Sequence, residues 1–196
     1  MNPLEDKDLS KKEKILQATL ESMKNDGFEG LTVRQIASRA HVNVALVNYY
    51  FGSKDKLLNE AIQVLVNSLR ESFTILDNNA MDPRERLEQF LIQYVSAHCK
   101  YPFIVHRLLT GEPFIFESQK EFFQFIKAIG LKKMQATVSE LTGESNPKVL
   151  TIMVSQLLGA VFLPPLVEPL YETITGYPFS DCKTQIRILL DRYFSN

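Results

Sequence analysis

Tryptophan is absent from the chain of 196 residues, and cysteine occurs only twice, at Cys99 and Cys182. These cysteines have neither a CxxC spacing nor a disulfide-framework pattern, so we expect a protein of the reducing cytoplasm. The first residues, MNPLEDKDLSKKEK, lack the apolar segment of a signal peptide. The longest apolar stretch, residues 149–163, is interrupted by three polar residues and stops at Pro164. We therefore expect it to be too short and too polar to cross a membrane.

Excess charge of one sign is also missing, because the net charge at pH 7 is −1. This excludes a bulk polycation, so that any nucleic-acid contact must use a local basic surface. Residues 10–56 offer one, with eight bases and five acids. The composition, 45% hydrophobic and 23% charged, is ordinary for a globular protein and excludes disorder, collagen and a coiled-coil rod. The 13 phenylalanines and 7 tyrosines predict a core or a pocket rich in aromatic rings.

Helix-start signals are dense along the chain. Capping boxes, in which a Ser or Thr precedes a Glu or Gln by three residues, begin at Ser10, Thr32 and Ser118. Asp82 and Asn146 each precede a proline, which is typical of a first helical turn. The pattern predicts an all-α fold with about nine helices and no strand pair.

Three of the expected helices lie in the second half of the chain. One begins at Ser118 and ends near Leu141. The next covers residues 147–163 and is apolar on nearly every face, which predicts burial within the chain or between chains. A stretch bearing proline and glycine, residues 164–178, is expected to follow it. The last helix, residues 181–194, is amphipathic.

Residues 32–51, TVRQIASRAHVNVALVNYYF, predict two short helices joined by a tight turn. Small apolar residues form the wedge between them, which is typical of a helix-turn-helix whose second helix enters the major groove of DNA. An asparagine there can bond an adenine edge, small apolar residues can touch thymine methyls, and tyrosine hydroxyls can reach phosphates. The second helix is expected to expose Val44, Ala45, Asn48, Tyr49 and Tyr50.

Residues 10–58 resemble the N-terminal DNA-binding domain of the TetR family of bacterial transcriptional regulators. The resemblance rests on the run TVRQIA at residues 32–37 and on ALVNYYFGSKDKLL at residues 45–58. Over the rest of the chain, the length and the helical layout are similar to the family's architecture. Two residues depart from its pattern. His41 stands where the family usually has a turn glycine, so we expect it to adopt a positive φ, and Tyr50 stands where histidine is common.

The resemblance implies a role for each residue of this surface. Contacts to the DNA backbone are implied for Thr32, Arg34, Tyr49, Tyr50 and Lys54, and base reading for Val44, Ala45 and Asn48. Asn43, which can cap the second helix, completes the predicted DNA-binding set. Lys54 also fits from first principles, because the amides of a helix N-terminus and an ammonium group can share one phosphate.

We expect two domains and a homodimer. Residues 1–56 would bind a near-palindromic operator in double-stranded DNA, and residues 57–196 would bind an effector and dimerise. The apolar helix after Pro147 and the last helix, taken from two chains, would form a four-helix seam. The predicted interface comprises Val154, Leu157, Leu158, Val161, Ile186, Leu189, Leu190 and Tyr193.

Aromatic residues gather between Phe90 and Phe125. The resemblance places an effector cavity in this part of the chain, and a ring-lined pocket suits a hydrophobic or aromatic small molecule. Each ring can equally belong to the core. The predicted pocket comprises Phe90, Tyr94, His98, Phe103, His106, Phe122 and Phe125.

No metal, no cofactor and no catalytic activity are expected. His98 and Cys99 are helical neighbours that diverge by about 100°, so they are poor partners in a metal site. Paired carboxylates, a nucleophile with its base, and a phosphate-binding loop are all lacking. The sequence thus predicts a transcriptional repressor that a hydrophobic effector releases from DNA. A regulator without a small-molecule effector, and an all-α carrier of lipids or aromatic ligands, are the alternatives.

Overall fold

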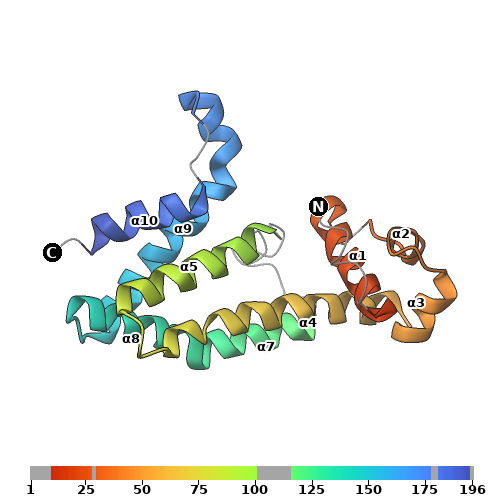
Figure 1. The fold of residues 1–196 in the computed structure, drawn as a ribbon, viewed down its shortest axis with the longest axis horizontal. Helices are drawn as coiled ribbons and strands as arrows, with labels where there is room; N and C mark the ends of the chain where they lie inside the picture. Colours follow the sequence, from red (N-terminus) through yellow and green to blue (C-terminus); the bar gives the residue numbers. More distant parts are fainter. Residues whose placement is uncertain (1–9, 28–29, 101–115, 178–180, 195–196) are drawn as a thin grey trace. The chain divides into compact units, whose positions relative to one another are not determined.

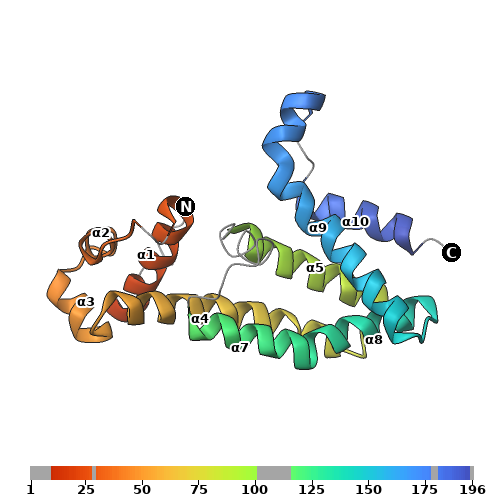
Figure 2. The same cartoon turned by 180° about the vertical axis from the view of Figure 1, so that it is seen from behind.

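The computed structural model describes residues 10–27, 30–100, 116–177 and 181–194. Every regular element in these ranges is helical, which confirms the predicted all-α fold (Figures 1 and 2). The chain divides into two compact units. One combines Met1–Val66 with Phe103–Lys120, and the other combines Asn67–Pro102 with Glu121–Asn196. The functional division at residues 56 and 57 stays a prediction.

The first unit holds α1 (Lys11–Asp26), α2 (Val33–Arg39), α3 (Val44–Phe51) and the beginning of α4 (Lys54–Ser72). α1 begins at the predicted capping box. The Ser10 N–H donates to Glu13 Oε2 at 2.7 Å, and the Glu13 N–H donates to Ser10 Oγ at 3.2 Å. The core of this unit is apolar and joins all four helices; its buried members are Ile15, Ala18, Ile36, Ala37, Ala40, Val47, Phe51 and Leu57.

The second unit holds the end of α4, a 3-10 turn (Ile75–Asp77), α5 (Pro83–Lys100), α8 (Leu131–Thr142), α9 (Pro147–Thr175) and α10 (Cys182–Tyr193). α7 (Glu117–Phe125) begins in the first unit and leads through a π-helical turn (Ile126–Gly130) directly into α8. α5 contacts both α8 and α10, and α8 contacts α9.

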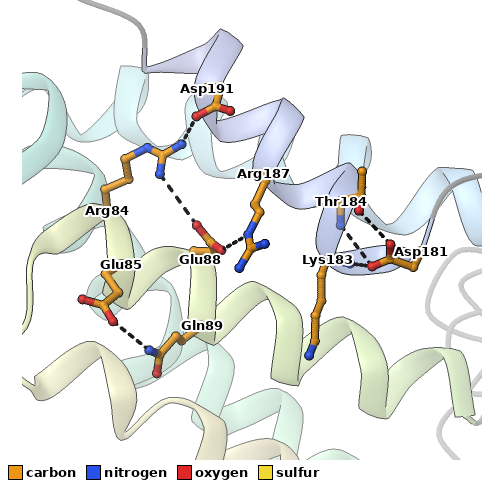
Figure 3. Close-up of polar contacts among 9 residues, drawn as sticks. All are labelled: Arg84, Glu85, Glu88, Gln89, Asp181, Lys183, Thr184, Arg187 and Asp191. Carbon is orange, nitrogen blue, oxygen red and sulfur yellow. Dashed lines mark hydrogen bonds and ion pairs between the residues drawn. The ribbon is translucent and has the colours of Figure 1, made fainter.

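Ion pairs join α5 to α10 at the surface of the second unit (Figure 3). Arg187 donates from Nε to Glu88 at 2.7 Å, and Arg84 pairs with Asp191 and, at 3.7 Å, with Glu88. The bond that Arg187 donates to Glu88 raises the pKa of Arg187 above its ordinary value. Exposed pairs of this kind contribute little to stability. The main attachment of α10 is therefore its buried apolar face, in which Leu190 is 0% exposed.

Ser118 does not cap the helix that it was expected to begin. α7 starts one residue earlier, and the Phe116 N–H donates to Gln119 Oε1 at 3.1 Å. The Ser118 hydroxyl instead donates to Asn59 Oδ1 of α4 at 3.3 Å. Both Phe116 and Gln119 are buried. The Ser118 hydroxyl thus makes a tertiary hydrogen bond instead of the helix cap that the local pattern predicted.

α9 is longer than the sequence predicted. It was expected to stop near residue 163, but it continues past Pro164 and Pro165 to Thr175 and ends at Gly176, which has a φ of 72°. A proline removes one backbone N–H and crowds the carbonyl four residues earlier, so it can bend a helix without ending it. The ribbon of α9 changes direction along its length (Figure 2).

Candidate DNA-binding interface

α2 is held at its start by a reciprocal cap. The Gln35 N–H donates to Thr32 Oγ1 at 3.2 Å, and the Thr32 N–H and hydroxyl both donate to Gln35 Oε1, at 2.9 and 2.8 Å. This confirms the predicted capping box. The Thr32 hydroxyl hydrogen is already used inside the protein, which leaves only an acceptor for DNA. Arg34, in the first turn of the helix, is exposed.

The turn between α2 and α3 depends on His41. Its φ of 54° is the only positive φ of a non-glycine residue in the described ranges, as the sequence predicted. Histidine tolerates this left-handed conformation at modest cost. The Val42 N–H then reaches back to the Ala37 carbonyl at 2.9 Å, which closes the turn.

α3 presents a polar face outward and an apolar face inward. Asn43 caps it by accepting from the Leu46 N–H at 2.7 Å. Val47 and Phe51 are 2% and 4% exposed and pack into the core. The outward residues are all exposed: Val44, Ala45, Asn48, Tyr49 and Tyr50. Every predicted base-reading residue therefore lies on the accessible face of one short helix.

Two tyrosines extend this face at the end of α3. Tyr49 is 81% exposed and Tyr50 is 37% exposed. Their rings meet edge to face, with centroids 5.4 Å apart. An edge-to-face pair restrains both rings, so the hydroxyl groups are held at the surface without being buried.

Lys54 is the first residue of α4, as predicted, and is half-buried. Ser53 accepts from the Lys56 N–H at 3.3 Å and caps the helix. Gly52, with a φ of 74°, makes the bend between α3 and α4. Lys54 therefore follows the reading helix directly and stands beside the exposed amides of a helix N-terminus, which attract phosphate.

Contacts that the sequence did not predict fix α1 against the helix-turn-helix. Arg39 donates from Nη1 to Ser22 Oγ at 2.8 Å, and Ser22 is fully buried. Lys12 pairs with Glu60 at 2.8 Å and lies over the ring of Phe51, 5.5 Å from its centroid. A polar residue in the apolar stripe of α1, Ser22, was the signal for the first of these contacts.

A groove of 340 Å³ lies between α1 and the turn of the helix-turn-helix. Its charged lining is predominantly basic and includes Lys11, Lys14 and Arg39, with Glu21 as its acid. The lining agrees with the local excess of bases in residues 10–56 and extends the positive surface beyond the predicted set. Positive charge of this kind strengthens DNA binding without regard to sequence.

The rings of the predicted effector pocket that the structure describes belong to a packed cluster. Phe73 lies at its centre, with ring centroids 4.7 Å from Phe90 and 5.3 Å from both Tyr94 and Phe125. Phe90 is 0% exposed, and burial raises the pKa of the Tyr94 hydroxyl above its ordinary value. Phe122 stacks on Phe125 at 6.2 Å.

The remaining predicted pocket residues are His98, Phe103 and His106. His98 lies in the last turn of α5. Phe103 and His106 are outside the described residues. Within the described ranges, no group of three or more His, Cys, Asp and Glu side chains is placed to hold a metal ion.

Most of the predicted dimer residues are buried inside their own chain. Val154, Leu157, Val161, Ile186 and Leu190 are each at most 5% exposed. The buried residues of α9 face the rest of the second unit, so they are not available to a second chain. The outward apolar face of α9 is a different one; its members include Ile152, Leu163, Leu170 and Ile174, which are 55%, 58%, 58% and 71% exposed.

Three predicted dimer residues are less enclosed. Leu158, Leu189 and Tyr193 are half-buried. The Tyr193 hydroxyl donates to Gln156 Oε1 of α9 at 2.7 Å, so this side chain also has a partner within its own chain. The predicted seam therefore consists mainly of the contacts that attach α9 and α10 to their own unit.

The apolar part of α9 also differs from the sequence prediction in its length and hydropathy. Pro147–Pro165, with 19 residues and a mean hydropathy of 1.5, is long and apolar enough to cross a membrane by composition alone, and 22% of it is buried. The expectation that it is too short and too polar was wrong by this measure. Its outward face is therefore an exposed apolar surface in the single chain.

Residues 15–61 match the family described as bacterial regulatory proteins, tetR family. The repressor NicS of Pseudomonas putida is 27% identical over 99 residues, which cover 50% of this chain and 47% of NicS. The regulator BetI of Agrobacterium fabrum is 37% identical over 73 residues, 37% of this chain and 35% of BetI. The chain thus spans less than half the length of these curated relatives.

Solved structures resemble the chain over almost its whole length. A TetR transcriptional regulator from Legionella pneumophila superposes with a TM-score of 0.68 at 18% identity, covering 96% of this chain and 100% of that one. The fatty acid degradation regulator FadR from Bacillus halodurans gives 0.64 at 16% identity, covering 96% and 97%. At these identities the likeness shows the fold alone.

The capped pair α2 and α3, with its exposed outward face, has the arrangement of a helix-turn-helix, the motif whose second helix enters the major groove of DNA. Residues 15–61 are similar to the DNA-binding domain of the tetR family of bacterial regulatory proteins, in agreement with the resemblance seen in the sequence. This is a family of regulators and not of enzymes.

Proposed function

We propose that the protein is a cytoplasmic, homodimeric TetR-type repressor that binds a near-palindromic operator and is released from it by a hydrophobic small molecule. The observation that carries the proposal is α3. Asn43 caps this helix, and the positive φ of His41 forms the turn before it. Its exposed face places Asn48 between small apolar residues and tyrosines. A relative named as a transcriptional repressor, NicS, supports the direction of regulation.

Asn48 is the proposed base reader. Its amide can make the two-pronged contact to adenine N6 and N7, whereas Val44 and Ala45 offer only apolar contacts to a thymine methyl. The proposed phosphate contacts supply affinity for any sequence. They come from Arg34, Tyr49, Tyr50 and Lys54. Thr32 was also predicted to contact the backbone, but its N–H and its hydroxyl hydrogen both bond Gln35, so it has no donor left for a phosphate oxygen.

The test compares two variants on two DNA duplexes. Asn48→Ala is expected to lose about 1–3 kcal/mol of binding free energy on the preferred operator and almost none on a scrambled duplex. Lys54→Ala is expected to weaken binding to both duplexes alike. The affinities are measured by titration at one stated salt concentration. Unchanged operator preference in Asn48→Ala contradicts its role as the reader.

The proposed dimer uses the outward face of α9. Ile152 and Leu163 lie on this face, and at Gly159, between them in sequence, an added Cβ would meet no atom within 4 Å. A small residue permits close approach of a second helix, and a symmetric pair of such faces would cover the exposed apolar surface. Half-sites one DNA turn apart require the two α3 helices to be about 34–36 Å apart.

The dimer proposal is tested by placing a charge on that face. Ile152→Glu is expected to give folded monomers by light scattering and to lose operator binding, because the glutamate would be desolvated without a partner. Ser68→Glu adds the same charge at an exposed position of α4 and is the matched control. A dimer of normal stability in Ile152→Glu would rule out this face, leaving a lipid surface or another segment as its cover.

The effector part of the proposal rests on the density of aromatic rings around Phe73. Rings so arranged favour apolar or aromatic ligands, and the structural neighbour FadR is named as a fatty acid degradation regulator. A ligand that releases DNA must bind the DNA-free state more tightly than the DNA-bound state. A regulator without an effector and an all-α carrier are separated from this proposal by mobility-shift assays with operator DNA, with and without apolar ligands.

A further inference from the structure

Arg70 is an incompletely satisfied arginine at the edge of the aromatic cluster. It lies in the last turn of α4, and its guanidinium carbon is 5.5 Å from the centroid of the Phe125 ring. Its Nε is buried and makes no hydrogen bond. Among the residues that the structure describes, no carboxylate pairs with it.

Arg86 is buried and its Nε also lacks a hydrogen bond, but the terminal nitrogens of its guanidinium group have partners in the same unit. Its Nη1 donates to the Leu76 carbonyl and to Asn79 Oδ1, both at 3.2 Å, and its Nη2 pairs with Glu140. The contact that the described residues give Arg70 is the ring of Phe125. A cation over a ring is attracted to the negative face of the ring, but the ring accepts none of the five N–H groups in the usual way.

Arg70 is half-buried, and an anion with a planar, two-oxygen acceptor would complete the bonds of its guanidinium group. A carboxylate matches the guanidinium fork with two parallel N–H···O bonds. The rings beside Arg70 determine the chemistry of the rest of the ligand, because Phe125 contacts both Phe73 and Phe122. A body of rings or methylene groups fits these neighbours.

The backbone next to Phe125 is irregular as well. Ile126–Gly130 forms a π-helical turn between α7 and α8, and such turns are frequent at functional sites. Gly130 lies so close to Phe73 that an added Cβ would be 3.0 Å from its Cε1 atom. The ring cluster and this turn thus form one connected structure next to Arg70.

We propose that Arg70 anchors the carboxylate of the effector, which is an apolar or aromatic carboxylic acid. The inference rests on the proposed regulatory function and narrows its ligand class from hydrophobic molecules in general to acids. α4 carries Arg70 in its last turn and Lys54 in its first. A ligand that pulls on Arg70 therefore acts on the same helix that is proposed to hold a DNA phosphate.

The experiment uses matched pairs of probes on the full chain. Benzoate, phenylacetate and decanoate are each compared with the corresponding amide by calorimetric titration. At least one acid is expected to bind and to weaken operator binding, and its neutral amide is expected to bind about 10- to 100-fold more weakly, the effect of losing a charged hydrogen-bond partner. Equal binding of acid and amide, or no binding by any of the acids, overturns the proposal.

Variants assign the effect to Arg70. Arg70→Gln is expected to lose the preference for acid over amide, and Arg70→Lys to keep part of it because the charge remains. Lys132→Gln removes one charge from an exposed position of α8 and is the control. Arg70→Gln must bind operator normally without ligand, which separates a failed ligand site from a failed regulatory function. An unchanged acid preference in Arg70→Gln overturns the assignment, and if this variant misfolds, Arg70→Lys decides.

Discussion

Gly130 gives a prediction in which two known effects oppose each other. An alanine in a helical segment is normally more stable than glycine by about 1 kcal/mol. At Gly130, however, the new Cβ would lie 3.0 Å from Ile126 Cδ1, 3.0 Å from Phe73 Cε1 and 3.3 Å from Phe73 Cζ. The Ile126 atom is the tip of a flexible side chain and can turn away. The Phe73 ring is 0% exposed.

The Phe73 ring has no room to yield. Its centroid is 4.7 Å from that of Phe90 and 5.3 Å from those of Tyr94 and Phe125. Overpacking a closed core of this kind costs about 1–3 kcal/mol, which exceeds the gain in helix propensity. Gly130→Ala is therefore expected to destabilise the protein by about 1 kcal/mol, the difference between these two effects.

Urea denaturation of four proteins measures the effect: the parent, Gly130→Ala, Phe73→Leu and the double variant. Because the smaller leucine leaves space for the Cβ, the cost of Gly130→Ala should fall by at least about 0.5 kcal/mol in the Phe73→Leu background. Additive changes, or a Gly130→Ala protein more stable than the parent, would refute the reasoning.

Three further changes probe the caps, the salt dependence and the packing of α1. The bonds that Thr184 donates lower the pKa of Asp181, so the stability that this carboxylate contributes is lost as the pH falls from about 4 through that lowered pKa. The melting temperature of Asp181→Asn should therefore change less with pH in this window than that of the parent, and parallel curves for the two proteins contradict this. Lys54→Ala should flatten the plot of log affinity against log salt by about 0.9 for each phosphate that Lys54 neutralises, and an unchanged slope removes Lys54 from the interface. Ser22→Ala should destabilise by about 1–3 kcal/mol in denaturant titrations, because the guanidinium of Arg39 is left without this acceptor, and an unchanged midpoint contradicts that role.

Local signals predicted the caps of the helix-turn-helix well. Thr32 and Asn43 each accept a bond from a residue three positions further along the chain, so that neighbouring sequence contains the whole interaction. His41 was predicted for the same reason, since its φ is set by the turn that it belongs to. The exposed face of α3 could also be predicted, because a short helix that buries two residues on one side exposes the opposite side.

Signals that depend on distant residues were less informative. Ser118 has the spacing of a cap, but Asn59, far away in sequence, takes its hydroxyl. Arg70 carries no local mark at all, because its significance comes from lying over Phe125 with no described carboxylate paired to it. A sequence pattern gives the spacing of residues along a helix and not the partner that the fold brings to them.

α9 shows why an apolar helix is the hardest case. Leu150, Val154, Leu157 and Val161 repeat at helical spacing, and so do the residues of the outward face. Two stripes of similar hydropathy give no indication of which one faces the chain's own core. Packing decides, because Leu157 is 2% exposed and Ile152 is 55% exposed. A charge at Leu157 would therefore test the folding of the chain, whereas a charge at Ile152 tests its assembly, and only the second bears on how two reading helices are held at operator spacing.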